Sequence, residues 1–211
     1  RALAWSSDKR YLADLAGAGV PVVPTAFAAP GEEMDWPPGE VVVKPAVSAG
    51  SIDTARHGPR DRARAGAHVA RLHAQGRTAM AQPYLPGVEG TRGETALVHI
   101  DGALSHAIRK GPMLVPGRRV VAGLFVEEEI TPATPTAAEA TVARAALAAV
   151  PGGGGDLLYA RVDLVPGPGG DPLVLEVELV EPSLFLAHSP GAAAALARAV
   201  RRWSAPATGR G

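Results

Sequence analysis

Two late segments of the chain alternate apolar and charged residues with a period of two. They span residues 159–165 (Tyr-Ala-Arg-Val-Asp-Leu-Val) and 173–179 (Leu-Val-Leu-Glu-Val-Glu-Leu). This alternation predicts two β-strands, each with one apolar and one charged face. A Pro- and Gly-rich segment, residues 166–172, lies between them, and Gly169-Gly170 is the expected two-residue tip of a hairpin.

Counting outward from that tip gives the register of the predicted hairpin. Asp163 then lies opposite Glu176, and Arg161 lies opposite Glu178, all on one face. Like charges on facing strands repel, so three carboxylates beside a single arginine are unexpected as plain structure. Mg²⁺ takes such oxygen ligands, usually one or two carboxylates together with substrate phosphates. The pattern therefore predicts a magnesium–nucleotide site, against the alternative of a solvated strand face with one ion pair.

The rest of the chain predicts a mixture of helices and strands. Ser7 or Asp8 can cap a first helix that ends near Gly17–Gly19. The other expected elements are an extended segment at 20–24, a loop at 28–39, a strand at 41–44 closed by Pro45, a helix at 59–75, a strand at 78–85, a hairpin of 94–100 with 104–110, a mobile surface loop at 111–129, and helices at 136–150 and 190–203. Because strands and helices mix without strict alternation, the predicted fold class is α+β.

Composition narrows the classes of protein that remain. The 211 residues suffice for one or two domains, and a formal net charge of zero favours neither nucleic acid nor an anionic membrane as partner. Cysteine is absent, which excludes disulfides and thiolate metal sites, and no apolar run is long enough to span a bilayer. A cytoplasmic protein is expected. Because the chain begins at Arg1 and opens almost directly into a helix, we expect a piece of a longer protein.

Several common site motifs are absent from the sequence. The chain contains no G-x-x-x-x-G-K-[ST], no H-E-x-x-H and no G-x-S-x-G. Lysine occurs only at positions 9, 44 and 110, and asparagine does not occur at all. Each lysine is therefore a candidate for a specific role.

Taken in order, motifs over nearly the whole chain resemble those of an ATP-grasp ligase of the glutathione synthetase-like or D-alanine ligase-like kind. They are Asp8-Lys9, Gly19-Val20-Pro21-Val22-Val23-Pro24-Thr25, Val42-Val43-Lys44-Pro45, Ser48-Ala49-Gly50-Ser51, Gln82-Pro83-Tyr84-Leu85, Glu94, Arg161-x-Asp163 and Glu176-x-Glu178. The runs 109–114 and 181–185 are also similar to runs in the cyclo-ligase group of cycloserine formation.

The resemblance implies an ATP-grasp fold, in which two α+β subdomains hold ATP between them. It places an N-terminal (lid) subdomain at 1–82 and a C-terminal subdomain with the metal site at 83–211. It also implies that the N-terminal domain that usually precedes them is missing here.

The resemblance assigns roles around the nucleotide. Lys9 and Lys44 correspond to lysines that reach the phosphates, where an ammonium on a flexible stem acts as a mobile point charge. The residues expected to cover the phosphates with backbone N–H groups are Ser48, Gly50 and Ser51. The hinge residues expected to meet the adenine are Gln82, Tyr84 and Leu85, and the acid for the ribose is Glu94, with Glu89 as its rival. The alternatives are a solvated Lys9, an ordinary polar turn at 48–51 and a core aromatic at Tyr84.

Further residues are expected at the reacting centre. Arg161 resembles the arginine that steadies the transferring phosphoryl group or the oxyanion, and it can also be a cross-strand partner of Glu178. Arg109, Lys110 and Ser183 are candidates for contact with substrate or acyl phosphate, or are loop and strand-end surface residues. The predicted metal ligands are Asp163, Glu176 and Glu178. Many family members have asparagine where this chain has Glu178, so the added charge favours two Mg²⁺ ions, with Mn²⁺ as an alternative metal.

The implied activity is ATP- and Mg²⁺-dependent ligation of a carboxylate to an amine or similar nucleophile. It proceeds through an acyl phosphate and releases ADP and phosphate. Two alternatives stay open: an ATP-grasp phosphotransferase that stops at the phosphorylated product, and a truncated nucleotide-binding module without turnover. The expected partners are small-molecule carboxylate and amine substrates, with no nucleic acid and no membrane, and a homodimer is left open.

Overall fold

The structure is a computed structural model that describes residues 1–48, 52–91, 93–111 and 129–205. Its α-helices are α1 (Ala2–Ser6), α2 (Tyr11–Gly17), α3 (Arg62–Ala74), α4 (Ala137–Ala148) and α5 (Ala192–Ser204). Its strands are β1 (Ala26–Ala28), β2 (Val41–Pro45), β3 (Ala55–His57), β4 (Ala79–Pro83), β5 (Glu94–Ile100), β6 (Ala103–Lys110), β7 (Ile130–Ala133), β8 (Tyr159–Pro166) and β9 (Pro172–Glu178). Short 3₁₀ turns are η1 (Pro59–Asp61), η2 (Pro86–Glu89), η3 (Gly154–Asp156) and η4 (Leu186–His188).

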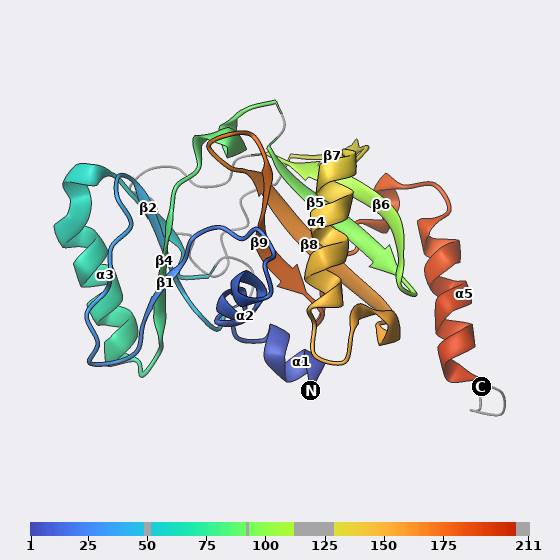
Figure 1. Ribbon diagram of the computed structural model, residues 1–211, viewed down its shortest axis with the longest axis horizontal. Helices are drawn as coiled ribbons and strands as arrows, with labels where there is room; N and C mark the ends of the chain where they lie inside the picture. Colours follow the sequence, from blue (N-terminus) through green and yellow to red (C-terminus); the bar gives the residue numbers. More distant parts are fainter. Residues whose placement is uncertain (49–51, 92, 112–128, 206–211) are drawn as a thin grey trace.

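The strands form two antiparallel sheets, which confirms the predicted α+β class. The smaller sheet has the order β1-β4-β2-β3 and the larger one β7-β6-β5-β8-β9. In Figure 1 the smaller sheet lies on the left with α3 on its outer side, and the larger sheet lies on the right between α4 and α5. Most of the loop predicted at 111–129 lies outside the described residues. Within the described part, no helix is both long and apolar enough to cross a membrane.

The first predicted helix begins later than expected and is preceded by a separate short helix, α1, so its expected cap at Ser7 or Asp8 is wrong. The chain turns after α1, and the Asp8 carboxylate accepts hydrogen bonds from the backbone N–H of Arg10 (3.0 Å) and from its guanidinium. This local side-chain contact stabilises a turn at Asp8–Arg10, and the turn takes the place of a helix there. The second helix, α2, therefore begins at Tyr11, with Arg10 at its N-cap. Lys9 lies in the turn between the helices rather than in a first helical turn.

The two faces of the larger sheet have different partners. Apolar side chains on one face, such as Leu97 and Val162, pack in one core with Val142 of α4. On the other face Val98 and Ile100 pack under α5. Because side chains alternate along a strand, Glu94 of β5 and Arg161 and Asp163 of β8 lie on this same second face. The alternation therefore leaves a charged area beside the end covered by α5.

The turn of the β8–β9 hairpin differs from the prediction. The backbone N–H of Gly167 donates to Asp171 (2.8 Å), and the N–H of Gly170 donates to Gly167 (2.9 Å). Gly170 has a φ of 85°, in the left-handed region. This is a three-residue loop with glycine at its left-handed position, not a two-residue tip at Gly169-Gly170.

The predicted register at the charged end of this hairpin is nevertheless confirmed. Arg161 pairs with Glu178, and Asp163 pairs with Glu176. A β-bulge follows Asp163, and Leu175 is the residue of β9 that it leaves without a partner. The extra residue in the loop and the extra residue in the bulge cancel, so the charged residues meet as expected.

An extended segment near the N-terminus ties the two sheets together. Val22 bridges Val174 of β9 in parallel, as expected for the strand-like segment at 20–24. The N–H of Val23 donates to Val174 (3.0 Å), and the N–H of Val174 donates to Pro21 (2.9 Å). The helix α2 also joins the larger sheet, because the backbone N–H of Val177 donates to the hydroxyl of its Tyr11 (2.7 Å). The boundary expected between residues 82 and 83 stays a prediction.

Candidate active site

Buried ion pairs lie on the charged face of the larger sheet. Lys110 of β6 contacts Glu94 of β5 (2.6 Å) and Asp163 of β8 (2.7 Å). Burial alone would raise the pKa of Asp163, but the charges of Lys110 and Arg161 outweigh it and hold that pKa well below its usual range. Burial raises the pKa of Glu94, and Lys110 offsets only part of this. Lys110 thus joins two strands through a pair of carboxylates.

Arg161 continues the chain of ion pairs toward β9. Its guanidinium donates two hydrogen bonds to Asp163 (2.8 and 2.9 Å), and it also donates to Glu178. Burial raises the pKa of Glu178 to about 7, and the nearby charges of Asp163 and Glu176 add to this. The predicted cross-strand contact of Arg161 with Glu178 is therefore present.

Lys9 links the acidic strand β9 to the end of β2. Its Nζ lies 3.0 Å from Glu176 and donates to the backbone carbonyl of Ser48 at 3.0 Å. Its backbone N–H donates to Ala46 (2.9 Å), just after β2. The turn between α1 and α2 thus places Lys9 where the two sheets approach each other, and only 6% of the residue is exposed.

Lys44 is a buried cation without an ion pair among the described residues. It is 8% exposed and lies near the end of β2, whose five residues are all buried. Burial lowers the pKa of Lys44, and the charges of Glu176 and Glu94 oppose that shift in part. The carboxylates of the larger sheet therefore act on this lysine of the smaller sheet without a direct contact.

These residues form one group, which we name the ionic cluster. Its charges balance, because four cationic side chains face four carboxylates when all are ionised. The members are Lys9, Lys44, Lys110 and Arg161, with Glu94, Asp163, Glu176 and Glu178. The carboxylate oxygens are the donor type that Mg²⁺ prefers, and Lys44, which has no ion pair within the described part of the chain, is a cation available to an anion. The residues therefore fit a magnesium–phosphate ligand, although no group of three acidic or histidine side chains is arranged as a metal site in the described part of the chain.

The predicted hinge residues make structural contacts. Gln82 donates to the hydroxyl of Thr25 (2.9 Å), and Leu85 packs against other apolar side chains. The hydroxyl of Tyr84 donates to Glu89 (2.7 Å). The Arg56 guanidinium lies 3.5 Å from the centre of the Tyr84 ring.

The two acids considered for the ribose occupy different surroundings. Glu89 is paired with Arg56 (2.6 Å) and makes no ion pair with the ionic cluster among the described residues. Glu94 belongs to the cluster, where Lys110 holds it. The ribose roles of Glu89 and Glu94 stay predictions.

Arg109 does not share the face of the ionic cluster. It pairs across the strands with Thr95, whose hydroxyl donates to Glu139 of α4 (2.8 Å). Because side chains alternate along β6, Arg109 and Lys110 lie on opposite faces of the sheet. The structure thus separates Arg109 from the predicted reacting centre, whereas it brings Lys110 into the cluster.

Sequence reasoning missed the contacts of Lys110 and the position of Phe185. The Phe185 ring centre lies 5.5 Å from Cζ of Arg161 and 6.0 Å from Nζ of Lys110. No periodic signal points to Phe185, because it lies in an irregular segment after β9. Gly50 and Ser51 lie outside the described residues, while Ser48 contacts Lys9 as described above.

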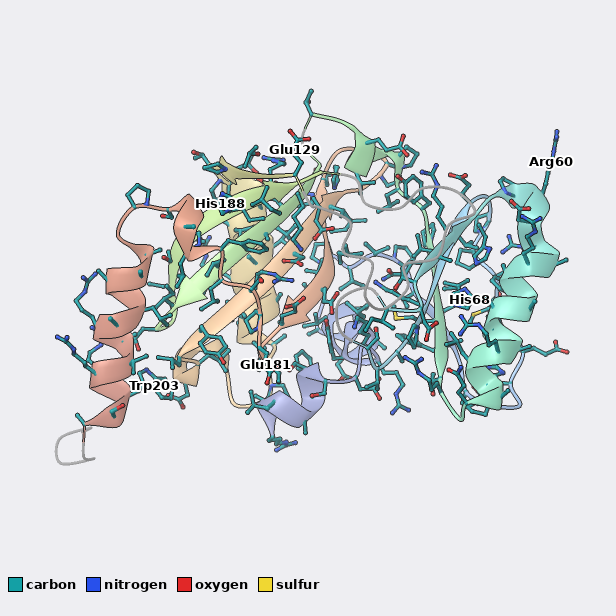
Figure 2. All side chains as sticks on the ribbon, turned by 180° about the vertical axis from the view of Figure 1, so that it is seen from behind. Arg60, His68, Glu129, Glu181, His188 and Trp203 are labelled. Atoms are coloured by element: carbon teal, nitrogen blue, oxygen red, sulfur yellow. The ribbon has the colours of Figure 1, made fainter. Side chains whose placement is uncertain are left out.

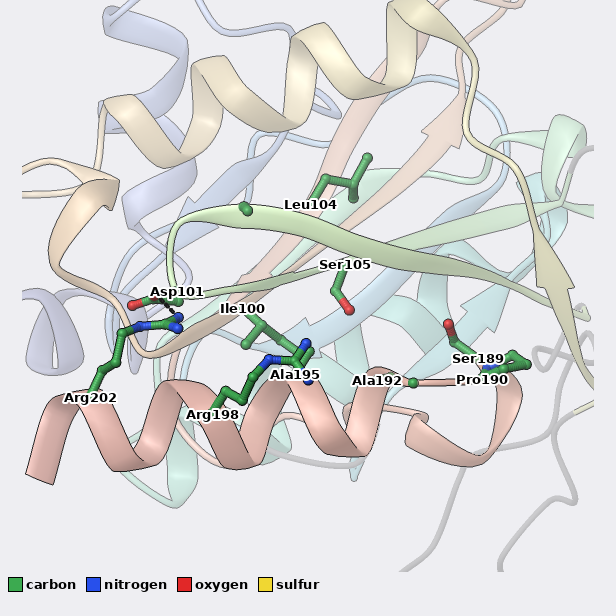
Figure 3. A pocket seen from close by; sticks show the side chains of 12 residues that line it. Ile100, Asp101, Leu104, Ser105, Ser189, Pro190, Ala192, Ala195, Arg198 and Arg202 are labelled. Atoms are coloured by element: carbon green, nitrogen blue, oxygen red, sulfur yellow. Dashed lines mark hydrogen bonds and ion pairs between the residues drawn. The ribbon is translucent and has the colours of Figure 1, made fainter.

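A separate hollow of about 500 Å³ lies between α5 and the β5–β6 hairpin (Figure 3). Arg198 and Arg202 of α5 line it, and Arg202 is paired with Asp101 at the hairpin turn. It lies at the other end of β5 from Glu94 and is lined by none of the predicted site residues.

Two α+β units meet at a set of lysines, an arginine and carboxylates. This fold and this cluster define an ATP-grasp type of protein. No family model matches the chain. A search of curated proteins found the cycloserine biosynthesis protein DcsG of Streptomyces lavendulae, 42% identical over 207 residues, which are 93% of this chain and 69% of that protein. The chain belongs to the ATP-grasp ligase family.

Solved structures agree with this assignment. The crystal structure of the D-cycloserine synthetase DcsG matches with a TM-score of 0.84 and 40% identity, over 95% of this chain and 71% of that one. A D-alanine–D-alanine ligase from Bacillus anthracis, complexed with ATP, matches with a TM-score of 0.66 and 17% identity, over 93% and 65% of the chains. The second likeness shows the fold alone. That ligase was solved with ATP, and the ATP-grasp ligase PsnB, which matches with a TM-score of 0.61 and 21% identity over 94% of this chain and 60% of that one, was solved with Mg and ADP.

Proposed function

We propose that this chain carries the ATP- and Mg²⁺-dependent centre of a ligase that joins a carboxylate to an amine or similar nucleophile. The reaction passes through an acyl phosphate and releases ADP and phosphate. The observation that carries the proposal is the buried Lys44, which has no ion pair among the described residues and faces the charges of Glu176 and Glu94. A buried unpaired cation is costly, so a site that retains one is expected to receive an anion.

Each cation of the cluster has a role in this proposal. Lys44 and Lys9 bind the phosphates, and Lys9 leaves its contact with Glu176 as they enter. Arg161 stabilises the charge that develops on the phosphoryl group as the substrate carboxylate attacks it in line. Asp163, Glu176 and Glu178 are the residues that would hold Mg²⁺, which when bound would neutralise charge on the phosphates. Two metal ions remain part of the proposal because Glu178 adds a third carboxylate.

Support for the substrate class comes from the relative named D-cycloserine synthetase. The identity of 40–42% extends over more than nine-tenths of this chain. We therefore propose that the substrate is an amino-acid derivative of the cycloserine class, with its carboxylate activated here.

Titration of the protein with ATP, with and without Mg²⁺, tests the proposal. The wild type is expected to bind ATP more tightly with the metal, and Glu176→Gln to lose about 10- to 100-fold in affinity, the effect of one charge-assisted contact. Glu33→Gln, at an exposed position, serves as the matched control. Equal affinity in all proteins and conditions would remove the proposed metal role. ADP release with a stable phosphorylated product would instead identify a phosphotransferase.

A further inference from the structure

The segment after β9 crosses the charged face with a strained backbone. Glu181 has a φ of 50° and Phe185 a φ of 47°, both in the left-handed region. That region is unfavourable for a bulky side chain and persists only where the surroundings impose it. In Figure 2 the segment runs from Glu181 to His188 across the sheet face that is turned away from α4.

Two side chains of the larger sheet hold this segment in place. Arg161 donates from Nη1 to the backbone carbonyl of Ser183 (3.2 Å). Nε2 of His106 lies 2.8 Å from the carbonyl oxygen of Leu184, which can only accept, so His106 donates there. The two carbonyls directly before Phe185 are thus tied to β8 and β6. This explains why Phe185 keeps an unfavourable φ.

The held backbone sets the Phe185 ring beside two buried cations. Cζ of Arg161, a residue that is 5% exposed, lies 5.5 Å from the ring centre. Nζ of Lys110, a residue that is 7% exposed, lies 6.0 Å from it. Both distances are within the range in which an aromatic face attracts a cation. The ring is therefore an apolar neighbour of the same cations that hold the carboxylates.

We infer that Phe185 is a positioning residue that excludes water from Arg161 and Lys110, and so limits hydrolysis of ATP when no acceptor is bound. The inference rests on the proposed function, because it concerns the same site. An apolar ring beside a cation keeps solvent from screening its charge. With the γ-phosphate bound at Arg161, as the proposed function has it, the ring would also limit the approach of water to that phosphate.

The reaction that the ring limits is simple hydrolysis. A water oxygen forms a bond to the γ-phosphorus, and the bond from that phosphorus to the β–γ bridging oxygen breaks. ADP leaves with the bridging oxygen, inorganic phosphate is formed, and the proton of the water passes to solvent. No substrate carboxylate is needed, so the rate can be measured with ATP and Mg²⁺ alone.

The test compares ADP release from MgATP alone in the wild type, Phe185→Ala, Phe185→Tyr and Leu186→Ala. We expect Phe185→Ala to release ADP about 2- to 30-fold faster, the range that contacts of this kind supply. Phe185→Tyr keeps the ring and should match the wild type. Leu186→Ala truncates the half-buried neighbour and should also match it. A variant that merely folds poorly would lose ADP release rather than gain it.

The outcomes separate this inference from the proposed function. If the wild type binds MgATP and Phe185→Ala releases ADP at the same or a lower rate, the inference is wrong and the proposed function stands. If the wild type does not bind MgATP, the proposed function fails and the inference with it. An increase in Leu186→Ala equal to that in Phe185→Ala would assign the effect to general loosening and overturn the role of the ring.

Discussion

At the residue scale, two buried lysines with similar exposure have opposite surroundings. Lys110 is 7% exposed and contacts Glu94 and Asp163 at 2.6 and 2.7 Å. Lys44 is 8% exposed and has no ion pair among the described residues. A buried charge that has no partner lowers the stability of the folded protein. Removing one partner of a buried ion pair also lowers stability, because the other charge is then left uncompensated. The two lysines should therefore respond differently to the same substitution.

Replacing each lysine with methionine tests this contrast. Lys44→Met should keep or raise the unfolding temperature and weaken ATP binding, because it removes an unpaired charge that the ligand needs. Lys110→Met should lower the free energy of unfolding by about 3–5 kcal/mol, because Glu94 and Asp163 lose their partner. Thermal unfolding and ATP titration measure both effects. A large loss of stability in Lys44→Met with unchanged ATP affinity would contradict the role of Lys44.

At the element scale, β-bulges decide which charged residues meet. Counting outward from the Asp101-Gly102 turn without a bulge places Arg109 opposite Glu94. A register shift at Val98/His99 moves the pairing by one residue, so Lys110 faces Glu94 instead. Such a slip exchanges the two faces of a strand. The hairpin was therefore predictable from the sequence, but which member of the Arg109–Lys110 pair enters the site was not.

Irregularities in register were equally unpredictable in the β8–β9 hairpin, but there two of them cancelled. The three-residue loop at 168–170, between Gly167 and Asp171, shifts the predicted pairing by one residue, and the bulge at Leu175 shifts it back. Alternation alone predicted the faces of β8 and β9 because each strand keeps its period of two near the charged residues. Phe185 lay beyond any such pattern, because contacts from β6 and β8 fix its conformation.

A histidine pair between β3 and α3 predicts a dependence of stability on pH. Nε2 of His57 lies 3.2 Å from Nδ1 of His68, and both residues are buried. Burial, with the nearby charge of Arg71, lowers the pKa of His68 to about 4, below the value of about 6.5 for an unfolded chain. Between these values the unfolded state binds a proton that the folded state does not, so stability falls as pH drops from about 6.5 toward 4.

Chemical denaturation at a series of pH values measures this slope. His68→Gln should make it shallower, since the contribution of His68 to the difference in proton binding is lost while the pKa values of His57 and His99 stay lowered by burial. His188→Gln, in the η4 turn, should leave the slope in place. An unchanged slope in His68→Gln would show that other groups cause the acid sensitivity.

At the scale of the whole molecule, the fold follows from the order of the elements, while the site depends on how two sheets meet. The segment at Val22–Val23 binds the edge of β9, and Lys9 contacts both Glu176 and Ser48. The ordered motifs predicted this fold and the family to which the chain belongs. They did not predict that Lys110 and Arg161 would neutralise Asp163, because that depends on strand register and burial together.

A crystal structure with an ATP analogue that resists hydrolysis and Mn²⁺ in place of Mg²⁺ tests the central claim most directly, since the anomalous signal of manganese locates the metal. We predict a metal signal at the carboxylates of Asp163, Glu176 and Glu178, with the triphosphate against Lys44 between the two sheets. Metal and nucleotide bound elsewhere, for example in the hollow beside α5, would contradict the account.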